Sequence, residues 1–141
     1  MFIRIEPSSS VPIYRQITDQ IRYQIAAGLL KQGDRIPSVR ELALQLAVNQ
    51  NTVLKVYNEL CRENILKIER GEGTFVAAEQ QNIPEQDKLD MIAGPLRQAA
   101  VLAIQLNIPI DQTARLLQSE YATIMAQRTP PADDEKEKAH V

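Results

Sequence analysis

The chain has 141 residues, of which 44% are hydrophobic and 24% are charged, and its formal net charge is -2. These values are normal for a soluble globular protein, and the length allows one ordinary domain or a small domain with an appendage. The longest purely apolar run, Ala99 to Ile104, is far shorter than the roughly 20 residues that a membrane-spanning helix needs, and the N-terminus has no pattern of a secretion signal. We therefore expect a cytoplasmic protein with no membrane partner.

The charge is divided unevenly along the chain. Residues 1–78 carry ten Lys and Arg against eight Asp and Glu, whereas residues 79–141 carry six against ten, so the two parts have charges of +2 and -4. Only local charge matters at a contact, because salt screens charges over about 8 Å. The acidic total therefore does not exclude a polyanionic partner.

The side chains also limit the kind of core and the chemistry. With no Trp, two Phe and four Tyr, the core must be mainly aliphatic, which favours helices. Cys61 is the only cysteine, so no internal disulfide can form. No His or second Cys lies near it, so we expect a packing or half-buried thiol and no metal site.

A first helix is predicted after the leading segment. Its signal is an isoleucine every four residues, at Ile13, Ile17, Ile21 and Ile25. Ser8 to Ser10 offer helix-start chemistry, and Gly28 is a stop signal. We expect the isoleucine stripe, with Tyr14 and Tyr23, to form part of the core.

Two further helices follow a turn at Gly33-Asp34. Pro37 is a barrier to helix continuation, and Ser38 with Glu41 forms a capping box that starts a short helix over about 38–46. After Ala47-Val48, Asn49 can cap a third helix that runs to about Asn64. Because the connection is so short, the two helices must cross steeply, which predicts a helix-turn-helix.

The third helix has two different faces. At about 100° per residue, Val53, Val56, Tyr57 and Leu60 lie on one side, while Asn51, Lys55, Asn58 and Arg62 lie on the other. The first face suits a core, and the second suits a polar partner.

Residues Ile65 to Ala78 change to a β-strand pattern. Two short runs flank ERGEG, whose Gly71 and Gly73 supply the positive φ angles that a hairpin turn needs, and Phe75 is expected in the core. The order helix, helix-turn-helix, hairpin predicts a winged helix. The fold class is thus mainly α with a small β-hairpin wing.

The remaining chain predicts a short helical region and a tail. After a polar link at 79–85, a helical pattern runs from Leu89 to Leu106, either kinked or restarted at Gly94-Pro95, and Asn107 and Pro109 end it. Asp111 is expected to cap a last helix whose apolar side reaches Met125. We expect domains at 1–78 and 79–128, and a disordered tail at 129–141.

The two C-terminal helices are too short to bury their own apolar sides. About 45 residues cannot cover both stripes, so we expect a partner subunit to cover them. Two-fold symmetry would then present two recognition helices to a palindromic operator in double-stranded DNA. A small-molecule effector would have to use the groove between the two parts or the dimer seam, because a pocket of about 300 Å³ normally needs a walled domain.

No residue set indicates an enzyme or a cofactor. His140 stands alone in the tail, and we find no Ser/His/Asp or Cys/His set, no Gly-rich phosphate loop and no cluster of metal ligands.

The first turn of the third helix carries candidate base readers. Gln50 and Asn51 each offer a donor and an acceptor that fit adenine N6 and N7. Thr52 can touch a thymine methyl or a phosphate, and Lys55 can reach guanine or the backbone. The alternative is that amides near a cap only compete for backbone hydrogen bonds of the helix.

Several motifs in the same order resemble one known family. The runs PIYRQITDQI, GLLKQGDRIPSVRELA, VNQNTVLKVYNEL and RGEGTFV, between Pro12 and Val76, closely resemble the GntR family of bacterial winged-helix transcription regulators. The brief C-terminal part and the motif N-x-N-T-V at Asn49 to Val53 resemble its YtrA-type subfamily. The resemblance implies a homodimeric repressor, frequently of a transporter operon, whose C-terminal helices serve in dimerisation.

The resemblance also implies roles for three arginines and a glycine. The family arginine that matches Arg40 contacts DNA, although a surface ion pair with Glu41 or Asp34 is an alternative. Arg70 and Gly71 match the wing tip, which lies at the minor groove or the phosphates. Arg35 could contact DNA or hold its turn against the second helix.

Two residues depart from the family pattern. Glu72 replaces the basic or polar residue common in the wing tip, and Leu54 stands where many relatives outside the subgroup have Arg. Glu72, together with the modest net charge of +2 on residues 1–78, leaves open an alternative function. In that alternative the winged helix binds a protein instead of DNA.

Overall fold

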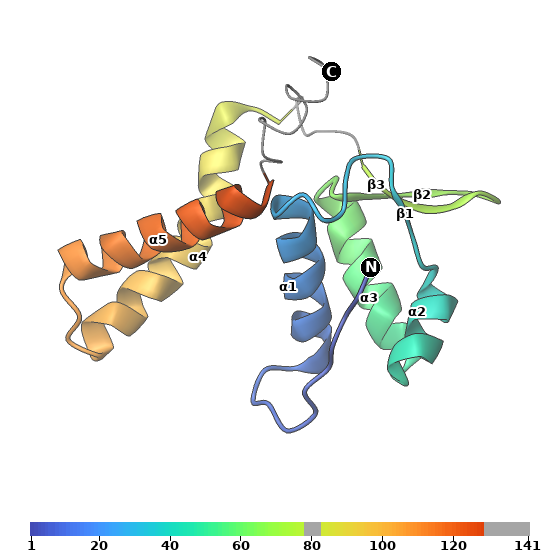
Figure 1. The fold of residues 1–141 in the computed structure, drawn as a ribbon, viewed down its shortest axis with the longest axis horizontal. Coiled ribbons are helices and arrows are strands. Elements are labelled where there is room, and N and C mark those ends of the chain that lie inside the picture. Colours follow the sequence, from blue (N-terminus) through green and yellow to red (C-terminus); the bar gives the residue numbers. More distant parts are fainter. Residues whose placement is uncertain (78–82, 129–141) are drawn as a thin grey trace, which may run out of the picture. The chain divides into compact units, whose positions relative to one another are not determined.

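The structure is a computed structural model that describes residues 1–77 and 83–128 (Figure 1). It is mainly helical with a small three-stranded sheet. The predicted fold class is confirmed, although the sequence predicted only the two strands of the hairpin. By its internal contacts the chain divides into one unit with every element from α1 to β3, here called the head, and a second with α4 and most of α5. The predicted tail at 129–141 lies outside the described residues. The elements are α1 (Ile13–Ala26), β1 (Arg35–Ile36), α2 (Val39–Leu46), α3 (Gln50–Arg62), β2 (Leu66–Glu69), β3 (Gly73–Val76), α4 (Glu85–Gln105) and α5 (Ile110–Arg128).

Helix α1 begins and ends almost where the sequence predicts. Gly28, at φ +76°, follows its last turn as expected. The prediction that Ser8 to Ser10 start the helix is wrong, because Pro12 occupies the cap position and no side chain caps it. Its fixed φ already suits the start of a helix.

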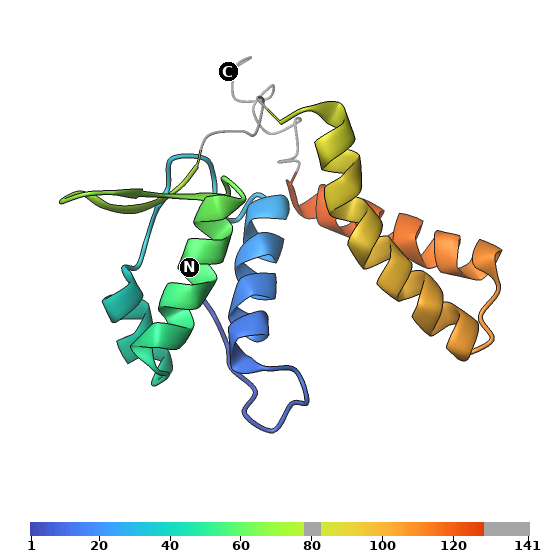
Figure 2. The same ribbon diagram turned by 180° about the vertical axis from the view of Figure 1, so that it is seen from behind.

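One side of α1 faces the core. Ile17 and Ile21 are fully buried, and Tyr14 packs against the core, whereas Ile13 and Tyr23 are exposed, so the expected core stripe is narrower than predicted. The ion pair of Arg22 with Glu63 joins α1 to the end of α3. The two helices lie side by side (Figure 2).

The sequence analysis missed a ladder that attaches residues 2–6 to α1. Glutamine side chains spaced four residues apart on α1 form hydrogen bonds with the backbone of every second residue of this segment. The spacings match, since four helical residues advance about 6 Å and two extended ones about 6.6 Å. Ile3 thereby reaches the core. The bonds, at 2.7 to 3.0 Å, join Glu6 to Gln16, Arg4 to Gln20 and Phe2 to Gln24.

The wing is a hairpin joined by a third strand. β2 and β3 pair antiparallel around the turn at 70–72, as predicted, and β1 pairs with the other edge of β3, opposite Thr74 and Phe75. The hairpin prediction was therefore incomplete. Phe75 is not in the core, because Thr74 and Val76 point inward and the side chain between them points to the opposite face.

The core of the head is aliphatic around one tyrosine. Tyr57 is its largest fully buried side chain, and isoleucines, leucines and valines of every head element surround it. This confirms the aliphatic core that the composition predicted.

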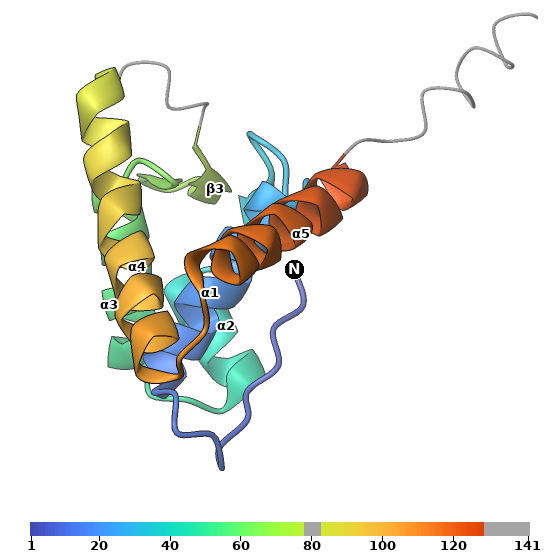
Figure 3. The same ribbon diagram turned by 90° about the vertical axis from the view of Figure 1, so that its left-hand side faces the viewer.

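Helices α4 and α5 differ from the head in having no buried residue. α4 runs as one helix through Pro95, without a restart (Figure 3). Asn107, at φ +57°, follows its end as predicted. The prediction that Asp111 caps α5 is wrong, because Asp111 is the second residue of the helix. Its negative charge still interacts favourably with the positive N-terminal end of the helix dipole. No helix among the described residues combines the length and the apolar character of a membrane span.

Candidate nucleic-acid interface

Short-range hydrogen bonds set the start of both helices of the helix-turn-helix. The backbone N–H of Glu41 donates to Ser38 Oγ at 3.1 Å, which caps α2 as predicted. Ala47 takes the left-handed conformation at φ +53° and turns the chain. The backbone N–H of Asn51 then donates to Asn49 Oδ1 at 2.8 Å, so Asn49 caps α3. The side-chain oxygen of Asn49 thus sets where the helix begins.

The rotation of α3 about its axis is fixed by its buried face. Val53, Val56, Tyr57 and Leu60 are fully buried, as predicted. The Tyr57 hydroxyl also donates to the carbonyl oxygen of Pro37 at 2.6 Å. Since one side of α3 is anchored in this way, its other side faces solvent. The exposed residues there are Gln50, Asn51, Leu54, Lys55, Asn58 and Arg62.

The amides at the start of α3 lie outside the fold. Gln50 and Asn51 are exposed, and only the backbone of Asn51 takes part in the cap. Their side chains are therefore available for contacts. Thr52 is half-buried, which leaves it a smaller accessible surface than the sequence suggested.

Lys55 has a partner that the sequence analysis missed. Its ammonium lies 4.1 Å from the centre of the Tyr14 ring, a cation–π contact between α3 and α1. This directs Lys55 to the α1 side of the exposed face. Lys55 is exposed, as predicted, but its ammonium points toward α1 and not straight outward from α3.

Arg40 is exposed in the first turn of α2 and forms no ion pair with a described residue. The alternative of a pair with Glu41 or Asp34 is thus not found, since Asp34 instead accepts a hydrogen bond from the backbone of Lys31 at 2.8 Å. Its guanidinium is free to meet an anion.

Arg35 lies against the wing. A Cβ added at Gly73 would be 3.0 Å from Arg35 Nε, so the guanidinium lies against the backbone at the start of β3, next to the turn of the wing. The sequence had weighed a contact with the second helix instead. The signal that was missed is β1, because a strand of two residues before a proline is too short to recognise.

The wing tip combines a basic residue with two acidic ones. Arg70 is exposed, and Gly71 takes φ +79° in the turn. Lys67 Nζ lies 2.9 Å from Glu69 Oε1. A hydrogen bond between the side chains of Glu69 and Glu72 raises the pKa of Glu72, as does the charge of Glu69, while the bonds from Lys67 and Glu72 lower the pKa of Glu69. Glu72 is thereby turned toward Glu69.

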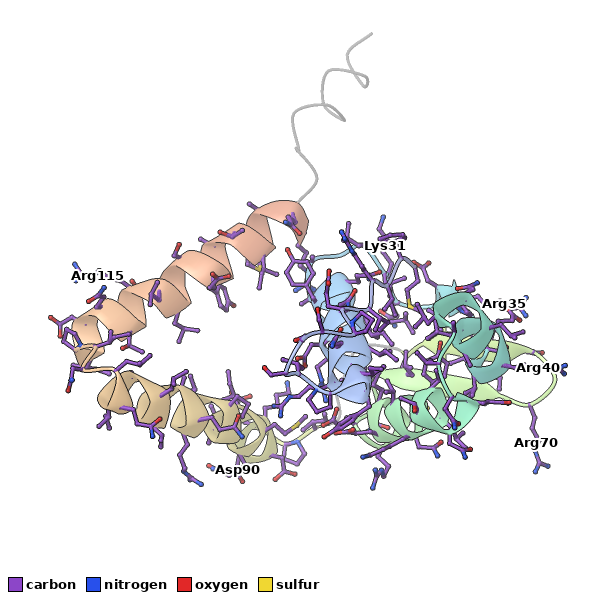
Figure 4. The ribbon with its side chains drawn as sticks, turned by 90° about the horizontal axis from the view of Figure 1, so that it is seen from below. Lys31, Arg35, Arg40, Arg70, Asp90 and Arg115 are labelled. Carbon is purple, nitrogen blue, oxygen red and sulfur yellow. The ribbon has the colours of Figure 1, made fainter. Side chains whose placement is uncertain are left out.

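Three arginines project from the same end of the head. Figure 4 shows Arg35, Arg40 and Arg70 pointing outward on the α2 and wing side of the head, from β1, α2 and the wing tip. The two-helix motif and the wing therefore share one basic side.

Comparisons with known proteins agree on one family. Residues 13–76 match the model described as bacterial regulatory proteins, gntR family. The HTH-type transcriptional repressor YtrA of Bacillus subtilis is 39% identical over 110 residues, which are 78% of this chain and 85% of that protein.

Solved structures give the same result. A structure described as a transcriptional antiterminator from Listeria monocytogenes has a TM-score of 0.77 at 31% identity, and the match covers 88% of this chain and 92% of that one. YtrA from Sulfolobus acidocaldarius, described as a GntR-family transcription factor, has a TM-score of 0.53 at 40% identity over 68% and 97% of the two chains.

Proposed function

The chain belongs to the GntR family of bacterial regulatory proteins and is a DNA-binding transcription regulator of the YtrA type, and from this we propose that it is a homodimeric repressor of a palindromic operator. The observation that carries the proposal is the division of α3 into a buried apolar face and an exposed polar one. Such a helix presents its first turn to the major groove.

The base contacts are assigned to the start of α3. Gln50 and Asn51 each place a donor and an acceptor against adenine, with about 1 to 3 kcal/mol of discrimination for each good pair. Thr52 adds a contact to a thymine methyl or a phosphate. Asn49 holds this turn in place through its cap, and its side-chain amide is assigned a hydrogen bond to a phosphate.

The backbone contacts are assigned to the basic side of the head. Arg40 meets a phosphate beside the major groove, and Arg70 enters the minor groove, whose negative potential attracts arginine. Gly71 lets the wing backbone approach closely. Arg35 supports the wing through Gly73 and extends to a phosphate. Lys55, held at the edge by Tyr14, contacts the strand next to α1.

The proposed dimer uses α4 and α5. Large apolar side chains of both helices are exposed in the single chain, among them Ile104 at 75% and Tyr121 at 67%. The element pairs that pack extensively all lie in the head, so these two helices do not cover one another's apolar sides. A second copy can bury both stripes, which stabilises by about 25 cal/mol for each Å² removed from water.

A two-fold dimer sets the form of the operator. Two copies of α3 related by symmetry read two inverted half-sites, separated by one turn of DNA or a multiple of it. Control of a transporter operon is the target that the likeness to YtrA-type repressors favours.

A gel shift on DNA upstream of the protein's own gene tests the DNA-binding mode. Arg40→Ala should weaken binding and lower the slope of log affinity against log salt by about two, one phosphate contact for each subunit. Arg115→Ala is the matched control, because Arg115 is an exposed arginine of α5 and should leave that slope unchanged. If the affinity changes neither with salt concentration nor on Arg40→Ala, the assignment is contradicted.

A further inference from the structure

Leu54 is an apolar side chain on an otherwise polar face. The exposed residues of α3 are amides and cations except for Leu54, which is 42% exposed. It follows Asn51 by three residues and precedes Asn58 by four, so all three lie along one side of the helix. Packing in the core accounts for Val53 and Val56 but not for a side chain at this position.

The flank that Leu54 occupies is the one away from Lys55. The contact with Tyr14 takes Lys55 to the α1 side of the exposed face. Helix α3 packs on β2, and Cys61, two turns after Leu54 on the same flank, is hydrogen-bonded to the backbone of Ile68 in β2. This flank therefore faces the wing. Leu54 lies nearer the start of α3, at the end assigned to the groove.

The chemistry of the major groove leaves one complement for such a side chain. Base edges there present amines, carbonyls and ring nitrogens, and the only apolar group is the C5-methyl of thymine. A leucine against a polar edge would remove water from that edge and return no hydrogen bond, which is unfavourable. Against the methyl, both apolar surfaces are buried together.

We propose that Leu54 reads the C5-methyl group of one thymine in each half-site, so that this residue sets part of the operator sequence. The proposal rests on the proposed function, in which the first turns of α3 lie in the major groove. Because Leu54 and Asn51 lie on one side of α3, the thymine read by Leu54 lies close to the adenine assigned to Asn51. The recognised unit of each half-site is then rich in A·T pairs.

The test uses duplexes that differ by one methyl group. Binding sites are first selected from random DNA with the full chain, and each thymine of a half-site is then replaced by deoxyuridine. At one position the affinity of the wild type should fall about fourfold, and tenfold or more when both half-sites are changed, the factor expected for losing one buried carbon at each. Placing 5-methylcytosine against cytosine at that position should reproduce the gain, since it restores only the methyl.

Variants of the leucine connect this effect to the residue. Leu54→Ala should bind thymine and deoxyuridine duplexes alike at the same position, within about twofold, whereas Leu54→Met should keep most of the discrimination, because its volume is similar. Leu44→Ala is the control, since Leu44 is 74% exposed on α2 and should leave the discrimination unchanged.

Two results would overturn the proposal: a selected site in which no thymine methyl matters, or a Leu54→Ala protein that still distinguishes thymine from deoxyuridine at the same position. If instead no duplex is enriched at all, the proposed DNA-binding mode fails first, and the role of Leu54 with it.

Discussion

The Tyr57 hydroxyl, in the middle of α3, donates a 2.6 Å hydrogen bond to the carbonyl oxygen of Pro37, the residue before the cap of α2. Tyr57 is fully buried, and burial with the nearby charge of Glu41 raises its pKa, so the hydroxyl stays a donor throughout the physiological range. Together with the valines around it, this bond fixes how the two helices of the DNA-binding motif cross.

Replacing Tyr57 by Phe should destabilise the head. The change leaves the part-buried carbonyl of Pro37 without its partner, at a cost of about 1 to 3 kcal/mol. Urea unfolding followed by circular dichroism measures the loss. Tyr14→Phe is the matched control, because it keeps the ring beneath Lys55 and should change stability by less than about 0.5 kcal/mol. Equal stabilities for Y57F and the wild type would mean that the bond does not anchor α3.

Asn51→Ala should change specificity more than general affinity. The proposed pair of hydrogen bonds to adenine is lost, so the preference for A·T at that position should fall by about 1 to 3 kcal/mol, while the salt dependence stays the same. Competition between the selected duplex and variants at each base pair measures this. Gln118→Ala is a suitable comparison, since Gln118 is an exposed amide on α5, away from the proposed readers. An unchanged base preference for N51A would remove Asn51 from the readers.

The motifs with strong local signals were predicted from the sequence. Ser38 and Asn49 are caps because a short polar side chain before an apolar repeat bonds the exposed N–H groups of the first turn, and that chemistry is local. The faces of α3 were predicted for the same reason, since they depend on helix geometry alone.

Features that depend on distant residues were not predictable. β1 exists because β3 offers it an edge, and the side chain of Arg35 then lies against Gly73. Phe75 was placed in the core by its apolar character, whereas the pairing register directs Thr74 inward. The meeting of Lys55 with Tyr14 likewise requires the packing of α3 on α1.

The wing should make DNA binding depend on pH. Because its pKa is raised, Glu72 takes up a proton at a higher pH than an ordinary glutamate, which removes a negative charge beside Arg70. DNA phosphates repel the charged form of Glu72 and therefore favour the neutral one, so affinity should increase as the pH falls from neutral toward the raised pKa of Glu72.

Glu72→Gln is the variant that tests this wing effect. It should bind DNA about twofold more tightly for each wing at neutral pH, the size usual for exposed charges, and should show a flatter pH profile than the wild type. Fluorescence anisotropy across the pH series measures both. Glu85→Gln, at the exposed start of α4, is the control. A parallel profile for E72Q and the wild type would contradict the role of Glu72.

An acidic substitution in α5 should separate the proposed dimer. Leu117→Asp would bury a carboxylate in the apolar seam, which should weaken association by roughly 100-fold. Sedimentation equilibrium measures the mass, and circular dichroism checks that helix content is kept. Gln118→Asp places the same charge on the neighbouring exposed residue and should have a smaller effect. An L117D protein with the wild-type mass and affinity would exclude this seam.

The central claim is that two copies of α3, joined through α4 and α5, present their exposed amides to one duplex. The most direct test is to select bound sites from random double-stranded DNA with the full chain and align the recovered sequences. The account predicts two inverted half-sites with A·T pairs at the positions read by Asn51 and Leu54, spaced by one helical turn or a multiple. Recovery of a single asymmetric site, or of no enriched sequence, would contradict it.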